Sequence, residues 1–323
     1  MALKVAIRRS VNVARSSLRG KTPQLWKKRI VGTRGNDGWI AKLCIYAVLS
    51  CIAFLYLQPV LYMISTMLKN LVDLLDPTVQ WFPRVLEFEN VQKAWKGLRY
   101  PEAFFNTLVI ALFGSIFQVL SCAVTGYALA RLKFPGKKII FALVILTFLV
   151  PPQIIIIPLF IIFSKLGWLN TPLVFLVPAL FGQGIKSALF ILIFRQFFKS
   201  LPAALEEAAK IDGASTFRLF ARIMLPLARS GCLVVFLFSF IWYWNQYYQP
   251  TMFLTDSFIP LSIRLNGLEQ ELLGVRSYSE SAKALTEGVK MAGAFLIILP
   301  PLLLYLVAQR WFVEGIEKTG LVE

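Results

Sequence analysis

The chain has 323 residues, of which 57% are hydrophobic, and a formal net charge of +17. Ordinary soluble domains are about 45–50% apolar, so this composition argues against a soluble enzyme. The sequence contains no histidine, which excludes a His-containing zinc or haem site and a Ser-His-Asp triad. Its four cysteines form no CxxC pair and are interpreted as small packing residues: Cys44, Cys51, Cys122 and Cys232.

Residues 1–39 form a basic arm. Residues 1–42 hold eleven Lys/Arg against one acid, Asp37. No short apolar core follows the early charges, so the arm is not a signal peptide. We expect a disordered or membrane-surface segment and no nucleic-acid binding.

Six apolar blocks have the length that a helix needs to cross a bilayer, about 20 residues. Helices satisfy their own peptide groups in lipid, and the alternating pattern of a membrane barrel is absent. We therefore predict an all-α integral membrane protein with six transmembrane helices at 40–311 and a cytoplasmic tail at 312–323. The blocks are Ile40–Thr66, Phe104–Ala130, Ile139–Phe163, Leu173–Phe194, Leu227–Tyr247 and Met291–Trp311.

The placement of the charges predicts the orientation of these helices. The N-terminal arm and the RLKFPGKK stretch after the second block are basic, whereas residues 67–103 and 251–289 contain at least as many acids as bases. Lys and Arg accumulate in cytoplasmic loops, so we expect both termini in the cytoplasm. The loop at 200–226 then also lies inside.

Prolines interrupt two of the blocks. The third block contains Pro151, Pro152 and Pro158, and the sixth contains Pro300 and Pro301. Proline frees backbone carbonyls that neighbouring helices or water must satisfy. We expect broken or bent helices around a central cavity, although kinks that serve packing alone explain each proline as well.

Two polar stretches within the blocks are candidates for a substrate path. In GQGIKS, Gln183 and Lys186 fall near mid-membrane, where a lysine usually faces a cavity, unless it snorkels to the surface. In FIWYWNQYYQP, aromatic rings are suited to stack on the C–H faces of a sugar, and side-chain amides are suited to bind its hydroxyls. An aromatic belt at the membrane interface explains the rings equally well. The candidates there are Trp244, Asn245, Gln246 and Tyr248.

The stretch EEAAKIDGASTFRLFARIMLPLARS, residues 206–230, reads as a soluble helical hairpin between blocks four and five. Ser200 is a plausible N-cap with Pro202 in the first turn, and Gly213 can end the first helix in a left-handed conformation. Ser215 or Thr216 can cap the second helix, and Pro226 marks the entry to block five. We expect the hairpin to dock on a cytoplasmic partner; the alternative is an amphipathic loop on the lipid surface.

The hairpin resembles the coupling loop of bacterial ABC importer permeases, in particular the carbohydrate-uptake branch with MalG-like subunits. The pattern EAA-x3-G-x9-I-x-L-P is filled by Glu207, Ala208, Ala209, Gly213, Ile223, Leu225 and Pro226. Further similar stretches extend the resemblance over roughly residues 100–320. One departure is LARSG, where the family often has a second proline.

The resemblance implies a type I importer permease fold and a non-catalytic transport subunit. The implied partners are a second homologous permease, two cytoplasmic ATPases, an extracytoplasmic solute-binding protein contacted by 266–288, and a carbohydrate. The chain has no GxxxxGK[ST] loop, so ATP and Mg belong to the ATPases and this chain carries no cofactor. The implied docked helix is 205–215, and the implied coupling residues are Leu205, Glu206, Glu207, Ala208, Ala209, Asp212, Gly213 and Pro226.

Two other classes of membrane protein, secondary transporters and membrane enzymes, fit the sequence less well. An ion-coupled secondary transporter commonly uses Asp, Glu or His at depth, and the six blocks contain none there. A membrane enzyme needs a catalytic constellation, and none is apparent. The resemblance implies a sugar substrate, and Lys186 suggests that the sugar is acidic.

Overall fold

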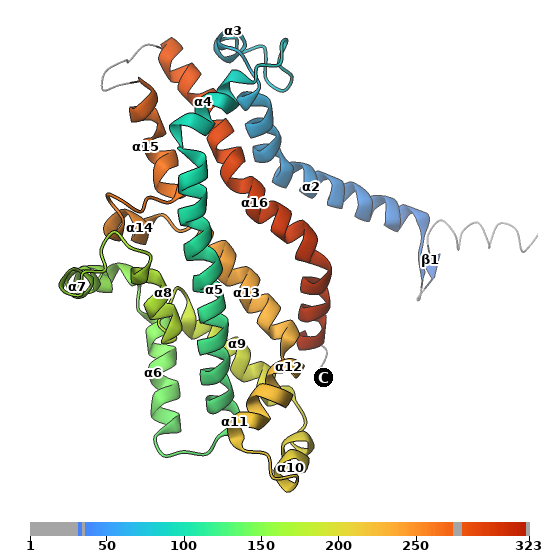
Figure 1. Ribbon diagram of the computed structural model, residues 1–323. Coiled ribbons are helices and arrows are strands. Elements are labelled where there is room, and N and C mark those ends of the chain that lie inside the picture. Colours follow the sequence, from blue (N-terminus) through green and yellow to red (C-terminus); the bar gives the residue numbers. More distant parts are fainter. Residues whose placement is uncertain (1–31, 34–35, 274–279, 321–323) are drawn as a thin grey trace, which may run out of the picture. The chain divides into compact units, whose positions relative to one another are not determined.

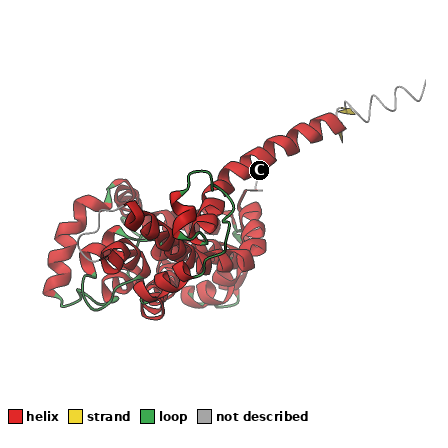
Figure 2. Ribbon diagram, turned by 90° about the horizontal axis from the view of Figure 1, so that it is seen from above, coloured by secondary structure: helices red, strands yellow, loops and turns green. Residues whose placement is uncertain are grey.

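The computed structural model describes residues 32–33, 36–273 and 280–320, and most of the described residues are helical (Figures 1 and 2). The chain divides into two compact units, Met1–Tyr62 and Met63–Glu323, each considered by itself. Most of the predicted basic arm, and residues 321–323 of the predicted tail, lie outside the described residues.

The first unit holds two antiparallel β-strands of two residues each and most of a long helix. In the pair, β1 (Gly32–Thr33) lies beside β2 (Asn36–Asp37), with Gly32 opposite Asp37. Helix α2 (Trp39–Met67) is apolar on all sides, and its side chains from Lys42 to Tyr62 are exposed. Such a helix is suited to a lipid environment.

In the second unit, α5 (Tyr100–Arg131) is the central element (Figure 1). It packs against α8 (Leu173–Leu180), α9 (Ser187–Ser200) and α13 (Arg229–Trp244). Helix α16 (Glu280–Gly320) packs in turn against α13.

Glycines on α5 allow these helices to approach closely. A Cβ atom at Gly126 would lie 2.6 Å from Cβ of Phe194 on α9, and one at Gly114 would lie 3.0 Å from the Tyr243 ring on α13. Small residues at helix contacts are typical of membrane bundles, where packing drives association.

Block three, Ile139–Phe163, is bent into two helices rather than forming one continuous helix. Helix α6 (Lys137–Leu149) and α7 (Pro152–Lys165) meet at an angle of 101°. Pro152 occupies the first turn of α7, where a missing N–H is tolerated, and Pro151 is held extended before it. The break predicted from these prolines is confirmed, but α16 continues as one helix through Pro300 and Pro301.

Block four is also divided, at a place the sequence did not predict. The predicted continuous helix Leu173–Phe194 is replaced by α8, the irregular segment 181–186 and α9. Gly182 and Lys186 both have left-handed backbones, with φ of 70° and 58°. That conformation ends a helix and costs a non-glycine residue energy, so surrounding contacts must stabilise it.

The end of the second unit where α5 begins also carries short helices: α3 (Leu71–Leu75), α4 (Glu89–Gly97), α14 (Tyr248–Phe253) and α15 (Leu261–Leu273). Before α4, the chain is held by a polar network in which the buried Lys69 ammonium donates to the carbonyls of Val79 and Gln80, at 2.7 and 2.9 Å. Hydrogen bonds from Thr78 and Arg84 lower the pKa of Asp76 to about 2.

The expected contact region for a binding protein, 266–288, covers the end of α15 and the start of α16. Residues 274–279 of this region lie outside the described residues.

The opposite end carries the hairpin, formed by α10 (Ala204–Ile211), α11 (Thr216–Leu219), the π-helix η1 (Phe220–Met224) and α12 (Leu225–Leu227). Three helices, α2, α5 and α16, are each long and apolar enough to cross a membrane. With three bent pairs counted as one span each, the described residues give up to six spans. The predicted all-α, six-helix membrane fold is thus confirmed.

Candidate coupling site and substrate path

The hairpin turns at Gly213, as the sequence predicted. Gly213 has a φ of 75°, in the left-handed region that glycine adopts without steric cost. The turn is closed by a hydrogen bond from the Ala214 N–H to the Ala209 carbonyl at 2.9 Å. Ser215 then caps α11 by accepting a hydrogen bond from the Arg218 N–H at 3.4 Å.

The start of the hairpin differs from the prediction. Ser200 is the last residue of α9, not an N-cap, and its hydroxyl donates to the Phe197 carbonyl at 2.8 Å. Pro202 consequently lies before α10 rather than in its first turn, and the helix begins at Ala204 without a side-chain cap. Pro226 lies inside α12, and the helix that forms block five begins at Arg229.

Helix α10 has an inner face and an outer face. Glu206 and Ala209 point inward and are buried, at 7% and 6% exposure. The side chains of Leu205, Glu207, Ala208, Ile211 and Asp212 are exposed, and Ile211 reaches 86% exposure. The outer face of α10 thus carries an exposed apolar side chain next to the Asp212 carboxylate.

The two adjacent glutamates therefore have different environments. The Glu206 carboxylate lies 3.2 Å from Nε of Arg131, at the end of α5, and 4.0 Å from the Lys210 ammonium. The Arg131 guanidinium also donates to the carbonyls of Phe198, at 2.9 Å, and Leu201. Arg131 thus joins the end of α5, the end of α9 and the first turn of α10.

Sequence reasoning missed Arg131, because 75 positions separate it from Glu206 and only the packing of α5 against α9 brings them together. One signal was available. No aspartate or glutamate occurs between Glu102 and Glu206, so a buried arginine in that range lacks a local acidic partner.

An aromatic cluster anchors the hairpin on the bundle. The ring of Tyr127 on α5 lies 5.5 Å from that of Phe198 and 5.1 Å from that of Phe220, centroid to centroid. Leu219 and Met224 are buried in the same cluster. The hairpin leaves α9 at an angle of 76° and meets α13 at 75°, so α10 and α11 project from packed helix ends.

The break in block four is held by side chains of α5 and α13. Gln118 Nε2 donates to the Ile185 carbonyl at 2.5 Å, and the Ile185 N–H donates to the Tyr243 hydroxyl at 3.3 Å. Ser121 donates to the Ala179 carbonyl at 2.7 Å. Irregular backbone at membrane depth is tolerated only where protein or a water-filled cavity satisfies it, and here protein does so.

The break changes where Lys186 stands. It is not inside a helix, as the sequence predicted, but at the N-cap of α9. Its side chain and that of Gln183 are exposed, while the adjacent Ser187 is buried. Neither side chain forms a hydrogen bond or an ion pair with a described residue, whereas the Gln183 N–H donates to the Pro178 carbonyl at 2.7 Å. The contact of these two side chains with a substrate stays a prediction.

The residues at the end of α13 divide into two groups. Trp244 is 1% exposed, and its Nε1–H donates to the Ile297 carbonyl at 3.0 Å, so in this conformation it is a packing residue. Asn245 and Tyr248 are exposed and Gln246 is half-buried. Their contact with a substrate stays a prediction.

This arrangement matches a known class of membrane subunits. The family model described as "Binding-protein-dependent transport system inner membrane component" matches residues 123–318. The lactose transport system permease protein LacG of Rhizobium radiobacter is 30% identical over 84% of this chain and 93% of its own length. The diacetylchitobiose uptake system permease protein NgcG of Streptomyces coelicolor is 30% identical over 84% of this chain and 86% of its own.

The sn-glycerol-3-phosphate transport system permease protein UgpE of Rhizobium meliloti is 28% identical over 81% of this chain and 90% of its own length. In a crystal structure of a bacterial ABC transporter involved in the import of the acidic polysaccharide alginate, one chain superimposes with a TM-score of 0.69. The two chains are 22% identical, over 84% of this chain and 96% of the other, so the six-helix permease fold is shared. The chain belongs to the family of inner membrane components of binding-protein-dependent transport systems, whose members are non-catalytic permease subunits.

Proposed function

We propose that this chain is one of two membrane-spanning subunits of an ATP-driven importer that takes up a carbohydrate, most simply an oligosaccharide. A solute-binding protein delivers the sugar, and two cytoplasmic ATPases power its passage. Relatives named for lactose and diacetylchitobiose uptake support the substrate class. The observation that carries the proposal is the hairpin, whose exposed outer face stands free of the bundle that it is anchored to.

In this proposal the hairpin is the mechanical link. The outer face of α10, with Glu207, Ala208 and Ile211, sits in a cleft of an ATPase. Movement of the ATPase displaces α10 as a rigid element. The Arg131–Glu206 ion pair and the aromatic cluster pass this displacement to α5, and hence to α9 and α13, which pack on it.

The orientation is part of the same proposal. The hairpin and both termini lie in the cytoplasm, and the α3–α4 and α15 regions face the binding protein. The excess of Lys and Arg in the arm and in the α5–α6 loop supports this orientation.

The energy source separates this proposal from an ion-coupled secondary transporter. Proteoliposomes that contain the complete complex and the binding protein should accumulate sugar when supplied with ATP and no ion gradient. We expect uptake to stop when ATP is withdrawn and an imposed proton gradient is kept. Uptake that persists on the gradient alone would overturn the proposal.

The substrate path passes the break between α8 and α9, and we propose that Lys186 faces it. Its exposed ammonium stands on a left-handed N-cap, next to the N-terminal N–H groups of α9, where an anion is favoured. This suits an acidic sugar such as a uronate-containing fragment. The fold shared with a chain of an alginate importer is compatible with such a substrate.

Replacement of Lys186 by methionine tests this assignment. An exposed charge contact is worth up to about 1 kcal/mol, so we expect a roughly threefold to fivefold lower rate with a uronate oligosaccharide and an unchanged rate with a neutral one of equal length. The measurement is initial uptake in proteoliposomes. Lys165→Met, on α7, is the matched control. Equal uptake of the acidic sugar by Lys186→Met and the wild type would refute the acidic-substrate proposal and leave the importer proposal intact.

A further inference from the structure

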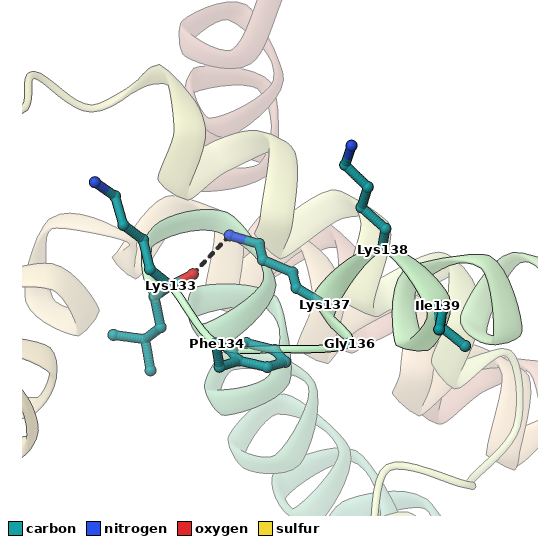
Figure 3. A pocket seen from close by; sticks show the side chains of 7 residues that line it. Lys133, Phe134, Gly136, Lys137, Lys138 and Ile139 are labelled. Carbon is teal, nitrogen blue, oxygen red and sulfur yellow. Dashed lines mark hydrogen bonds between the residues drawn. The ribbon is translucent and has the colours of Figure 1, made fainter.

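Positive side chains gather around the loop that joins α5 to α6. We define the α5–α6 cation cluster as Lys133, Lys137, Lys138, Arg195 and Lys199. Lys133 lies in the loop and Lys137 and Lys138 lie in the first turn of α6 (Figure 3), whereas Arg195 and Lys199 lie on α9. Arg195 lies against the Phe141 ring of α6. Burial, and then the positive charges of Arg195 and Lys199, lower the pKa of the Lys137 ammonium. Two separate parts of the chain therefore bring positive charge to one place.

The cluster lies in a part of the sequence, between Glu102 and Glu206, that contains no acid. Glu206, which ends the long acid-free part of the sequence, is engaged by Arg131 and Lys210. Among the residues that the structure describes, no carboxylate forms an ion pair with a member of the cluster. Lys137 instead donates to the Leu132 carbonyl at 2.8 Å. An anion that neutralises this positive charge must therefore come from outside the described part of the chain.

Arg195 supports the same conclusion from the other side of the cluster. Its guanidinium carbon lies 4.0 Å from the centre of the Phe141 ring on α6. Its Nε atom is buried, yet has no hydrogen-bond partner in the structure. A buried donor without an acceptor is costly, and an anionic oxygen would satisfy it.

The loop separates charge from apolar surface. Figure 3 shows the ammonium groups of Lys133, Lys137 and Lys138 on one side of the loop, with Phe134 and Ile139 on the other. These residues line an open cavity of about 540 Å³. Helix α6, which continues from the loop, has no fully buried side chain: Phe141 and Val144 pack partly against the bundle, and Ile139 is 68% exposed. Cations above an exposed apolar helix match the boundary between headgroups and acyl chains.

We propose that the α5–α6 cation cluster binds the phosphate headgroup of an anionic glycerophospholipid, whose acyl chains lie along the exposed face of α6. Given the orientation proposed above, this lipid belongs to the cytoplasmic leaflet. A loop that only sets topology needs positive charge near the membrane and does not need Arg195 and Lys199 to converge on it from α9. The loop begins directly after Arg131, the last residue of α5, so the cluster lies at the same end of α5 as its joint with the hairpin.

Native mass spectrometry of the purified complex tests the site. The complex is exchanged into detergent with equal amounts of dioleoyl phosphatidylglycerol and dioleoyl phosphatidylcholine, and the lipids retained are counted. Each lysine near an anionic surface is worth about a fivefold change in binding, so Lys133→Gln, Lys137→Gln and Lys138→Gln together should lower phosphatidylglycerol retention at least about tenfold. The matched control removes three lysines elsewhere, by Lys93→Gln, Lys96→Gln and Lys165→Gln, and should retain the lipid.

A charge-conserving variant and a competition with free phosphate complete the experiment. Lys133→Arg with Lys138→Arg keeps the charge and should bind as the wild type does, which separates loss of charge from misfolding. Equal retention by the triple variant and its control, or equal retention of both lipids by the wild type, would overturn the proposal. So would displacement of the lipid by 10 mM inorganic phosphate, because the cluster would then recognise a free anion. The measurement needs neither ATP nor sugar, so it does not depend on the import function.

Discussion

Replacing Glu207 by arginine is expected to uncouple ATP hydrolysis from transport. The Glu207 side chain is exposed on the outer face of α10 and forms no ion pair within the described residues, so it is free to contact an ATPase. A hydrogen bond to a charged group contributes about 1.5–3 kcal/mol, so Glu207→Ala should lower uptake roughly tenfold or more, and Glu207→Arg still further. ATP hydrolysis should continue but no longer respond to the sugar-loaded binding protein.

The measurement is the ratio of sugar imported to ATP hydrolysed in proteoliposomes. Glu102→Ala serves as the control, since it removes an equally exposed glutamate in the first turn of α5, at the end away from the hairpin. Both Glu207 variants should assemble with normal yield, because the Glu207 side chain is exposed and forms no ion pair with a described residue. Wild-type uptake in both would show that Glu207 is not the contact with the ATPase.

The second large effect is expected at Arg131. Replacing it by methionine leaves the Glu206 carboxylate buried without its partner and removes the donors that bind the Phe198 and Leu201 carbonyls. Breaking one side of a buried pair costs about 3–5 kcal/mol. We therefore expect Arg131→Met to lose most of its uptake and to unfold at a lower temperature, as followed by the thermal melting of the purified complex.

A double-mutant cycle separates the ion pair from the rest of the arginine's contacts. Glu206→Leu removes the buried charge, so combining it with Arg131→Met should restore part of the stability that Arg131→Met loses alone. Coupling should remain defective in the double variant, because α10 is no longer joined to α5. Additive losses in the two single variants would contradict a direct interaction between Glu206 and Arg131.

Features encoded within a few neighbouring residues were predictable from the sequence. The apolar blocks gave the membrane helices, Pro151 and Pro152 gave the break in block three, and Gly213 and Ser215 gave the turn and cap of the hairpin. Each depends on local chemistry: the length of an apolar run, the missing proline N–H, the freedom of glycine, or the serine hydroxyl.

Features that depend on distant residues were not predictable. The stretch 181–186 looks like the middle of one helix, and it is irregular because Gln118 and Tyr243 satisfy its backbone from other helices. Likewise, the coupling-loop motif singles out Glu207, but nothing in the sequence predicts that the neighbouring Glu206 is buried. Only the packing of α5 against α9 makes Glu206 an internal partner of Arg131 and leaves Glu207 exposed.

The break in block four also bears on how the chain is made. Ribosomes deliver α5 before the break and α13 after it, so Gln118 is already present when Ile185 enters the bilayer, whereas Tyr243 follows 58 residues later. Until that tyrosine arrives, the Ile185 N–H lacks its acceptor, and a continuous helix is the better way to satisfy the backbone in lipid. The hydrogen bonds that hold the break are therefore complete only after the fifth apolar stretch has been synthesised.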